Sequence, residues 1–216
     1  MKDKKYLLFD LDGTLTDPRE GITKSVQYAL AACGIDEPEL SALEHFIGPT
    51  LEESFGSAYK MDETQMRYAI KKYRERYVEK GIYENRLLPG AEELLCRLKD
   101  CGRVLALATS KPTPFALETL RMFSIDRYFT VAVGSEPENG IVTKGDVIRE
   151  VLTRLEVGEP SSAVMIGDRR HDIEGARECG LDAIGLEVGF ASPGELEAAG
   201  AAAVCRSFDE LYALLT

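Results

Sequence analysis

The chain has 216 residues, 44% hydrophobic and 29% charged, which suits one large domain or two modest ones with a well-filled core. Its net charge of −11 argues against nucleic acid as a partner, because a phosphate backbone requires basic surface. No apolar run approaches the roughly 18 residues of a membrane span, and the five cysteines are scattered, so we expect a cytoplasmic protein without a membrane partner.

The first predicted element is a short apolar run that ends in two aspartates. Residues 6–9 are typical of a buried strand, and Asp10, Asp12 and Gly13 follow at its end. Asp10 would then lie at the carboxyl end of the strand, where open α/β sheets bind ligands. Two carboxylates this close repel each other unless a cation or a shared proton intervenes. The alternative is a polar turn built on Asp12 and Gly13.

The next segment, residues 16–88, is predicted to be helical and to contain no strand. Asp17 is a candidate N-cap, with Pro18 at the first helical position and Glu20 as its capping-box partner. The turn Gly48-Pro49-Thr50 precedes a further helix. The segment is long enough to form a small helical bundle.

Beyond residue 88, helices and strands alternate. The expected helices cover residues 91–101, 113–123, 144–155, 173–179, 193–199 and 208–215, and the expected strands 104–108, 129–133, 163–166, 183–186 and 202–204. This alternation predicts an α/β fold with a doubly wound, Rossmann-like parallel sheet. Because the first strand precedes the helical segment, we expect a discontinuous α/β core, residues 1–15 and 89–216, interrupted by a helical cap, residues 16–88.

Polar residues follow three of the predicted strands. The carboxyl ends of parallel strands meet at one edge of a sheet, so these side chains should lie close together. They are Asp10 and Asp12 after the first strand, Thr109, Ser110 and Lys111 after strand 104–108, and Gly167 and Asp168 after strand 163–166.

Two further residues have both a functional and a structural interpretation. Lys144 lies on the apolar stripe of its predicted helix, where a lysine is costly unless a carboxylate or phosphate meets it. The alternative is that its ammonium group reaches water from the first turn. Asp172 would support a metal site or Lys144, or would serve as the N-cap of helix 173–179. Between Asp168 and Asp172, we interpret three residues as solvated loop residues: Arg169, Arg170 and His171.

In this order, the motifs Asp10-x-Asp12-Gly13-Thr14, Thr109, Lys144 and Gly167-Asp168-x-x-x-Asp172 resemble those of the haloacid dehalogenase superfamily. The segment 16–88 is similar to the four-helix cap inserted after that superfamily's first motif. The resemblance is closest to the branch of phosphoglycolate phosphatases and nucleotidases. It implies a Mg²⁺-dependent phosphatase that hydrolyses small phosphorylated metabolites through an aspartyl-phosphate. The first substrate candidates are a phosphoglycolate-like acid and a nucleoside 5′-monophosphate.

The resemblance also implies a role for each motif residue. Asp10 would be the nucleophile, and Asp12 the general acid and then the general base. Asp10, Asp168 and the backbone carbonyl of Asp12 would bind Mg²⁺. Lys144 would stabilise negative charge and, with Thr109 and Ser110, bind the phosphate. Substrate choice would lie in the cap, where each candidate could instead be a surface charge or a connector: Arg19, Lys24, Gly48, Pro49 and Thr50.

Three alternative functions use similar residues. A phosphosugar mutase resembling β-phosphoglucomutase would carry a histidine at the position of Ile22, which cannot act as a base. A pyrophosphatase would use the same fold. A receiver-like signalling module also has a phosphorylated aspartate, but it lacks an insert such as residues 16–88. We predict no protein partner.

Overall fold

The computed structural model describes residues 1–216, which divide into two compact units. The first unit comprises residues 1–16 and 87–216, and the second comprises residues 17–86. The chain passes between the units twice, and the two crossings pair as the short strands β2 (Thr16–Asp17) and β3 (Arg86–Leu87). Our prediction of no strand in this region was wrong here, because two residues are too short to show a strand period.

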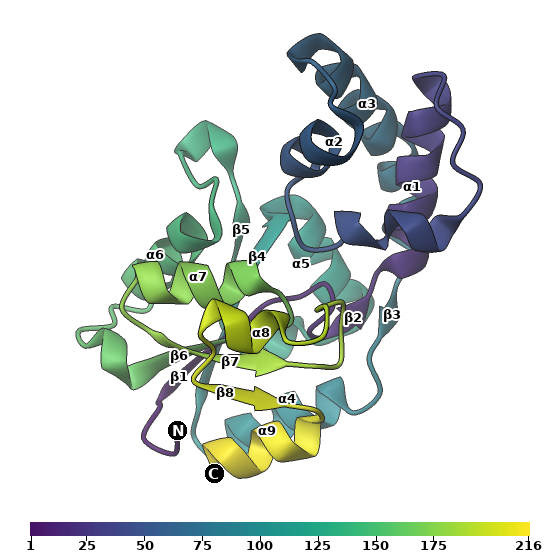
Figure 1. The fold of residues 1–216 in the computed structure, drawn as a ribbon. Helices are drawn as coiled ribbons and strands as arrows, with labels where there is room; N and C mark the ends of the chain where they lie inside the picture. The colour runs from purple at the N-terminus through teal and green to yellow at the C-terminus, as the bar shows by residue number, and fades with distance from the viewer. The chain divides into compact units, whose positions relative to one another are not determined.

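A six-stranded parallel sheet forms the centre of the first unit (Figure 1). The strands lie in the order β5-β4-β1-β6-β7-β8, which confirms the predicted doubly wound α/β fold. The chain builds outward from β1 on one side and then returns to add β6 on the other, so the strand order reverses beside β1. The strand bounds are β1 Tyr6–Phe9, β4 Val104–Pro112, β5 Phe129–Ser135, β6 Ala163–Gly167, β7 Asp182–Leu186 and β8 Ala203–Cys205.

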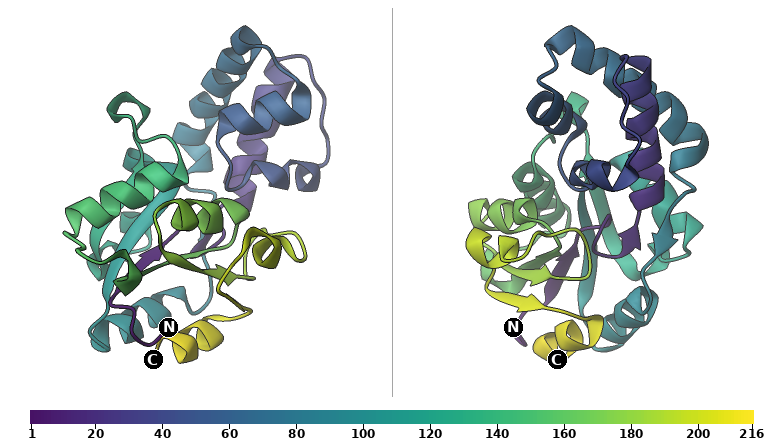
Figure 2. Two further views of the ribbon diagram at one scale, coloured as in Figure 1. Left: turned by 60° about the vertical axis from the view of Figure 1, so that its left-hand side comes forward. Right: turned by 45° about the vertical axis from the view of Figure 1, so that its right-hand side comes forward.

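Helices cover both faces of this sheet (Figures 1 and 2). Successive residues of a strand point to opposite faces. Leu7 and Phe9 therefore contribute to one apolar core and Leu8 to the other. The first core includes side chains of α4 (Ala91–Asp100), α5 (Thr113–Met122) and α9 (Phe208–Leu215), and the second those of α6 (Lys144–Arg154), α7 (Arg170–Glu178) and α8 (Glu195–Ala199). Short 3-10 turns lie at η3 Asp126–Tyr128, η4 Pro137–Asn139 and η5 Pro160–Ser162.

The second unit is helical. Its elements are α1 (Arg19–Ala32), the 3-10 helix η1 (Leu40–Phe46), α2 (Leu51–Tyr59), α3 (Glu63–Arg76) and the π-helical turn η2 (Tyr77–Gly81). A 3-10 helix therefore takes the place of one α-helix of the expected four. Asp62 and Gln65 form a capping box that fixes the start of α3.

The start of α1 differs from the prediction by one residue. Pro18, not Asp17, is the N-cap, although Asp17 Oδ1 accepts a hydrogen bond from the N–H of Arg19 at 3.0 Å. Glu20 forms an ion pair with Lys24 instead of completing a capping box. A charged partner one turn away is available to Glu20, and this pairing competes with the capping interaction.

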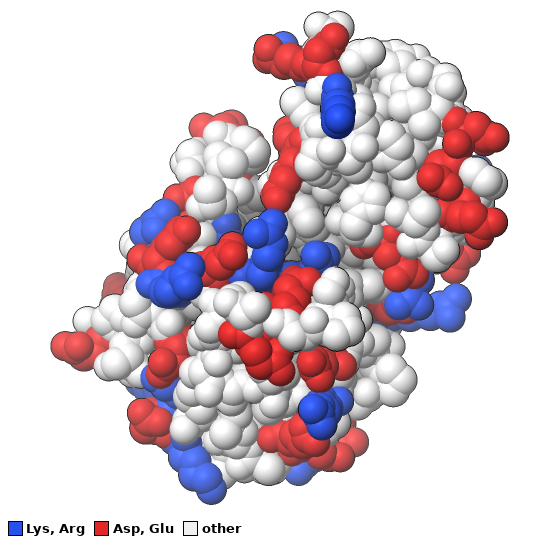
Figure 3. Space-filling view, viewed as in Figure 1, with Lys and Arg blue, Asp and Glu red and all other residues white.

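No helix of the structure is both long and apolar enough to cross a membrane. The chain has 37 acidic and 26 basic residues. Side chains of both signs are visible on the face drawn in Figure 3.

Candidate active site

The register of the sheet brings Asp10, Thr109 and Asp168 to one edge. Phe9 lies opposite Leu107 on β4 and opposite Ile166 on β6, so Asp10 comes one residue, and Thr109 and Asp168 two residues, beyond this row toward the carboxyl edge of the sheet. The N–H of Asp10 donates to the carbonyl oxygen of Ile166 at 2.9 Å, which continues the β1–β6 pairing to the aspartate. None of the three is more than 4% exposed.

Lys144 connects two of the aspartates. Its Nζ lies 3.0 Å from Asp10 Oδ1 and 2.8 Å from Asp172 Oδ1, and it donates to the carbonyl oxygen of Ala108 at 3.0 Å. The side chain is 5% exposed, so the alternative that its ammonium group reaches water was wrong. Burial favours the neutral amine, but the two carboxylates outweigh it and raise the pKa of Lys144. Lys144 is therefore a buried cation held between two anions.

Helix α7 is shaped to accommodate this lysine. Gly175 faces Lys144, and a Cβ placed there would lie only 2.8 Å from Cγ of the lysine. Glycine thus allows α6 and α7 to approach closely enough for the Lys144 side chain to pass between them.

Asp172 is not the N-cap of α7, contrary to one of our interpretations. The helix begins three residues earlier than predicted, with Arg169 as N-cap, and Asp172 Oδ2 accepts a hydrogen bond from the N–H of Arg169 at 3.1 Å. Arg169 is also less solvated than expected, since it pairs with Glu195 at 3.0 Å and its side chain is 13% exposed. Arg170 and His171 lie within the first turn of the helix, not in a loop.

The pKa of Asp172 is raised from 3.8 to about 6, chiefly by burial and also by Asp10, although Lys144 acts in the opposite direction. A proton is therefore bound more tightly in the folded state than in the unfolded state. This group favours folding at low pH, and its contribution is lost as the pH rises from about 4 to about 6.

We accordingly expect the free energy of unfolding of the wild type, relative to that of Asp172→Asn, to fall by up to roughly 3 kcal/mol between pH 4 and pH 7 in EDTA. Urea denaturation of both proteins across this range measures the difference. Parallel pH profiles would show that Asp172 titrates alike in the folded and unfolded states.

Asp168 lies in a narrow backbone cradle. Its Oδ1 accepts a hydrogen bond from Thr14 Oγ1 at 3.0 Å, and its Oδ2 accepts one from the N–H of Phe190 at 2.8 Å. Gly13 and Gly189 lie so close to this carboxylate that a Cβ on either would overlap it. Burial, followed by Asp172 and Asp10, raises the pKa of Asp168 well above its ordinary value. We did not predict from the sequence that the segment after β7 supports Asp168.

Asp10, Asp168 and Asp172 form a buried cluster whose carboxylate oxygens lie within 4.8 Å of one another. Burial raises the pKa values of Asp168 and Asp172, and repulsion from the neighbouring carboxylates raises them further. Lys144 neutralises only part of the charge. Hard oxygen ligands with excess negative charge fit a small divalent cation such as Mg²⁺. Asp10 and Asp168 are the two members of this cluster that we predicted as ligands of the cation.

Asp12 faces a second buried lysine. Asp12 Oδ2 lies 2.5 Å from Lys111 Nζ, and its Oδ1 accepts a hydrogen bond from Thr16 Oγ1 at 3.3 Å. The side chains of Lys111 and Asp12 are 5% and 11% exposed. The sequence placed Lys111 at the correct edge of the sheet, but we assigned it no role. Its position in a run of three polar residues after a strand was the only available signal.

Thr109 and Ser110 differ in their surroundings. Thr109 is buried, and its Oγ1 accepts a hydrogen bond from the N–H of Lys111 at 3.3 Å, whereas Ser110 is half-buried. Phosphate binding by these two residues stays a prediction.

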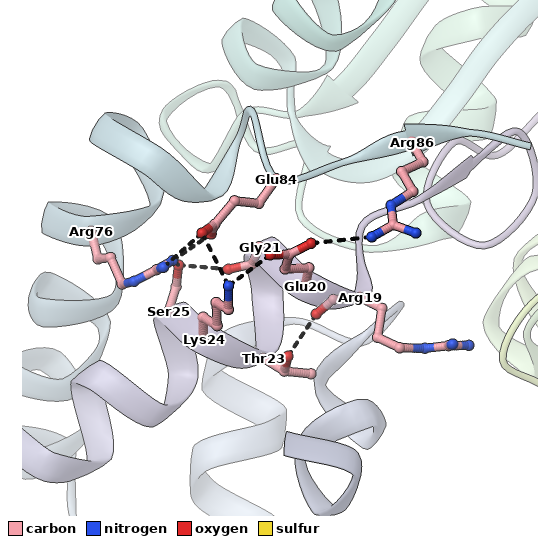
Figure 4. Close-up of polar contacts among 9 residues, drawn as sticks. All are labelled: Arg19, Glu20, Gly21, Thr23, Lys24, Ser25, Arg76, Glu84 and Arg86. Atoms are coloured by element: carbon pink, nitrogen blue, oxygen red, sulfur yellow. Dashed lines mark hydrogen bonds and ion pairs between the residues drawn. The ribbon is translucent and has the colours of Figure 1, made fainter. Parts of the chain in front are cut away.

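The cap candidates lie within the second unit. Arg19 pairs with Glu44 at 3.0 Å. Lys24 lies 2.6 Å from Glu20 and 3.5 Å from Glu84, and Figure 4 shows its ammonium between the two carboxylates. Arg76 contacts both oxygens of Glu84, at 2.8 and 3.0 Å, so Lys24 belongs to a charged cluster.

The turn before α2 contains the other three cap candidates. Gly48 has a positive φ of 106°, Pro49 follows it, and Thr50 is the N-cap of α2, where its side chain accepts a hydrogen bond from the N–H of Glu53. Thr50 therefore has a structural role in α2, and contact with substrate would be a second role. Contact with substrate stays a prediction for all five cap candidates.

The sequence and the fold were compared with known proteins. Residues 7–186 match the haloacid dehalogenase-like hydrolase family. The chain belongs to this family. The predicted resemblance is thereby confirmed, and the order of the motifs matches the order in which the strands deliver Asp10, Thr109 and Asp168 to the sheet edge.

Several proteins similar to this chain carry names that indicate phosphoryl chemistry. A 5′-nucleotidase of Pseudomonas aeruginosa is 50% identical over 192 residues, covering 89% of this chain and 86% of that protein. The tyrosine-protein kinase PtkA of Mycobacterium tuberculosis is 37% identical over 86% of this chain, which spans 63% of PtkA. A phosphoglycolate phosphatase of Escherichia coli is 28% identical over 88% of this chain and 83% of its own.

The fold is shared with solved structures. The crystal structure of a predicted phosphatase from Clostridium acetobutylicum superimposes with a TM-score of 0.94, at 45% sequence identity and with 98% of each chain covered.

Proposed function

We propose that this haloacid dehalogenase-like phosphatase is Mg²⁺-dependent and hydrolyses small phosphomonoesters through an aspartyl-phosphate on Asp10. The observation that carries the proposal is the pair Asp10 and Asp12. Each of these buried carboxylates is paired with its own buried lysine at the carboxyl edge of the sheet, and Asp168 lies beside Asp10. A structural ion pair requires one carboxylate and one lysine, whereas this edge gathers at least four carboxylates around two lysines.

Asp10, Asp168 and the backbone carbonyl of Asp12 would hold the Mg²⁺ ion. Bound there, the cation would offset the repulsion between the Asp10 carboxylate and a phosphate dianion. Asp172 would not contact the cation and would instead position Lys144 beside Asp10.

In the first step, a carboxylate oxygen of Asp10 attacks phosphorus and the bond from phosphorus to the leaving oxygen breaks. Asp12 gives its proton to that oxygen, so the leaving group departs as an alcohol. Lys144 stays beside Asp10 and stabilises the negative charge that accumulates as the new bond forms.

In the second step, Asp12 takes a proton from water, and that water attacks the phosphorus of the aspartyl-phosphate. The bond from phosphorus to the Asp10 oxygen breaks, which releases inorganic phosphate and restores the carboxylate. One residue thus serves as acid and then as base, which returns the site to its starting protonation state.

A nucleoside 5′-monophosphate is the favoured substrate class, because the relative named 5′-nucleotidase shares more identity with this chain than the relative named phosphoglycolate phosphatase. A comparison of kcat/KM with Mg²⁺ for nucleoside monophosphates, phosphoglycolate, a hexose phosphate and pyrophosphate tests this proposal and its alternatives. The highest value for a nucleoside monophosphate supports it. Turnover of pyrophosphate alone, or conversion of the hexose phosphate to its isomer, would contradict it.

Asp12→Ala should reduce hydrolysis of alkyl phosphates more than that of aryl phosphates. A good leaving group departs without a proton, whereas an alkoxide needs one, and general-acid catalysis of this kind contributes about 10²- to 10⁴-fold. The ratio of the two kcat/KM values measures the effect. Equal losses for both substrates would remove the general-acid role from Asp12.

A further inference from the structure

Lys111 is a buried cation that the reaction scheme above does not use. It pairs with Asp12, whereas Lys144 pairs with Asp10 and Asp172. A buried lysine requires a polar partner, and here that partner is the carboxyl group proposed to transfer the proton. This division of the two lysines suggests that Lys111 acts through Asp12.

The end of β4 is irregular in a way that delivers Lys111 to this position. Ala108 lies opposite Val133 on β5, but Pro112 lies opposite Ser135, so β4 advances by more residues than its partner across this stretch. Extra residues in one strand form a bulge, which redirects side chains and is frequent beside active sites. The bulge contains Thr109, Ser110 and Lys111.

The neighbouring strand is adapted to the bulge. A Cβ at Gly134 on β5 would overlap the carbonyl oxygen of Lys111 and crowd the backbone N of Thr113. The N–H of Gly134 also donates to Thr113 Oγ1 at 3.0 Å, which fixes the chain just after Lys111. The backbone of Lys111 is therefore held in place from the side of β5.

The two oxygens of the Asp12 carboxylate are held separately. Lys111 Nζ contacts Oδ2 and Thr16 Oγ1 donates to Oδ1, so rotation of the carboxylate breaks at least one contact. We propose that Lys111 is a positioning residue that fixes the Asp12 carboxylate in the orientation needed for proton transfer to the leaving oxygen. The inference rests on the proposed function, since it presupposes hydrolysis with Asp12 as the general acid.

The test compares 4-nitrophenyl phosphate with a simple alkyl phosphate in Lys111→Met. We expect the ratio of alkyl to aryl kcat/KM to fall about 10-fold or more, because misplacing a general acid affects the poor leaving group most. If Lys111 instead bound the phosphate, which both substrates share, the two values would fall equally and the inference would be overturned.

A double-mutant cycle separates positioning from a general structural role. In an Asp12→Ala background, Lys111→Met should change the alkyl-to-aryl ratio little, because the residue through which Lys111 acts is already absent. A change as large as that seen in the wild-type background would overturn the inference. If Asp12→Ala alone hydrolysed both substrates as fast as the wild type, the proposed function would be wrong. A failure of the proposed function is thereby distinguished from a failure of the inference about Lys111.

Lys4 provides a matched control. It is also buried, with a side chain 5% exposed, and it pairs with Asp182 at 2.6 Å near the opposite ends of the strands. Lys4→Met should leave the ratio unchanged, and a fall equal to that in Lys111→Met would overturn the inference. Lys111→Arg, which keeps the charge and avoids an unpaired buried carboxylate, should retain more of the ratio than Lys111→Met. No difference between these two folded variants would count against positioning by charge.

Discussion

Replacing Asp10 by asparagine should abolish Mg²⁺-dependent hydrolysis of an aryl phosphate. An amide is nearly the same size as a carboxylate, but it cannot attack phosphorus under these conditions. Removal of a covalent nucleophile lowers the kcat of a hydrolase by about 10⁶-fold. Initial rates with a chromogenic aryl phosphate at saturating Mg²⁺ measure the loss.

The fold should survive this change. Asp10 is one of three clustered carboxylates, and its loss relieves repulsion with Asp168 while leaving Lys144 paired with Asp172. Circular dichroism and thermal melting in EDTA check this point. Asp209→Asn is a suitable control, since Asp209 is 90% exposed and pairs only at the surface with Arg97. Measurable turnover by Asp10→Asn, at a level near that of the control, would rule out Asp10 as the nucleophile.

Asp168→Asn should lose the stabilisation that Mg²⁺ confers on the wild type. A ligand that binds only the folded state raises the melting temperature, and removal of a ligating carboxylate should weaken the binding more than the roughly 10- to 100-fold effect of a supporting group. Melting curves with and without Mg²⁺ measure this difference independently of activity. The same Mg²⁺-dependent shift in both proteins would show that Asp168 does not hold the cation.

Because the pKa of Asp168 is raised, the effect of Mg²⁺ on stability should depend on pH. Burial and the neighbouring aspartates favour its protonated form, and a metal ion must displace that proton to bind. Mg²⁺ should therefore stabilise the wild type less as the pH is lowered. Melts of Asp182→Asn, in which a half-exposed aspartate at the far ends of the strands is changed, should respond to Mg²⁺ as the wild type does.

The sequence was sufficient to predict the sheet and the residues at its edge. Strand β1 and the placement of Lys144 on a buried helical stripe depend on local periodicity, which a single sequence displays. The end of β4 and the start of α7 could not be predicted correctly from the sequence. β4 continues to Pro112 through a bulge that only its pairing with β5 reveals, and α7 begins with a charged residue that no capping signal marks.

The parts of the site that the sequence did not reveal depend on contacts between distant residues. Lys111 meets Asp12 across 99 positions of the chain, and Phe190 reaches Asp168 from the segment after the next strand. Gly189 is one glycine among 19, and nothing local distinguishes it from a turn residue. Its close approach to Asp168 follows from the packing of β7 beside β6, which periodicity alone does not define.

The proposed mechanism requires the phosphoryl group to pass through Asp10, and a chemical trap can detect this intermediate. Wild type and Asp12→Ala are mixed with an aryl phosphate and Mg²⁺, quenched in acid and treated with borohydride, which reduces an aspartyl-phosphate to homoserine. Peptide mass spectrometry should find homoserine at position 10, with more in Asp12→Ala because its second step lacks a base. Unmodified Asp10 in both proteins during turnover, or modification of another residue, would exclude Asp10 as the nucleophile.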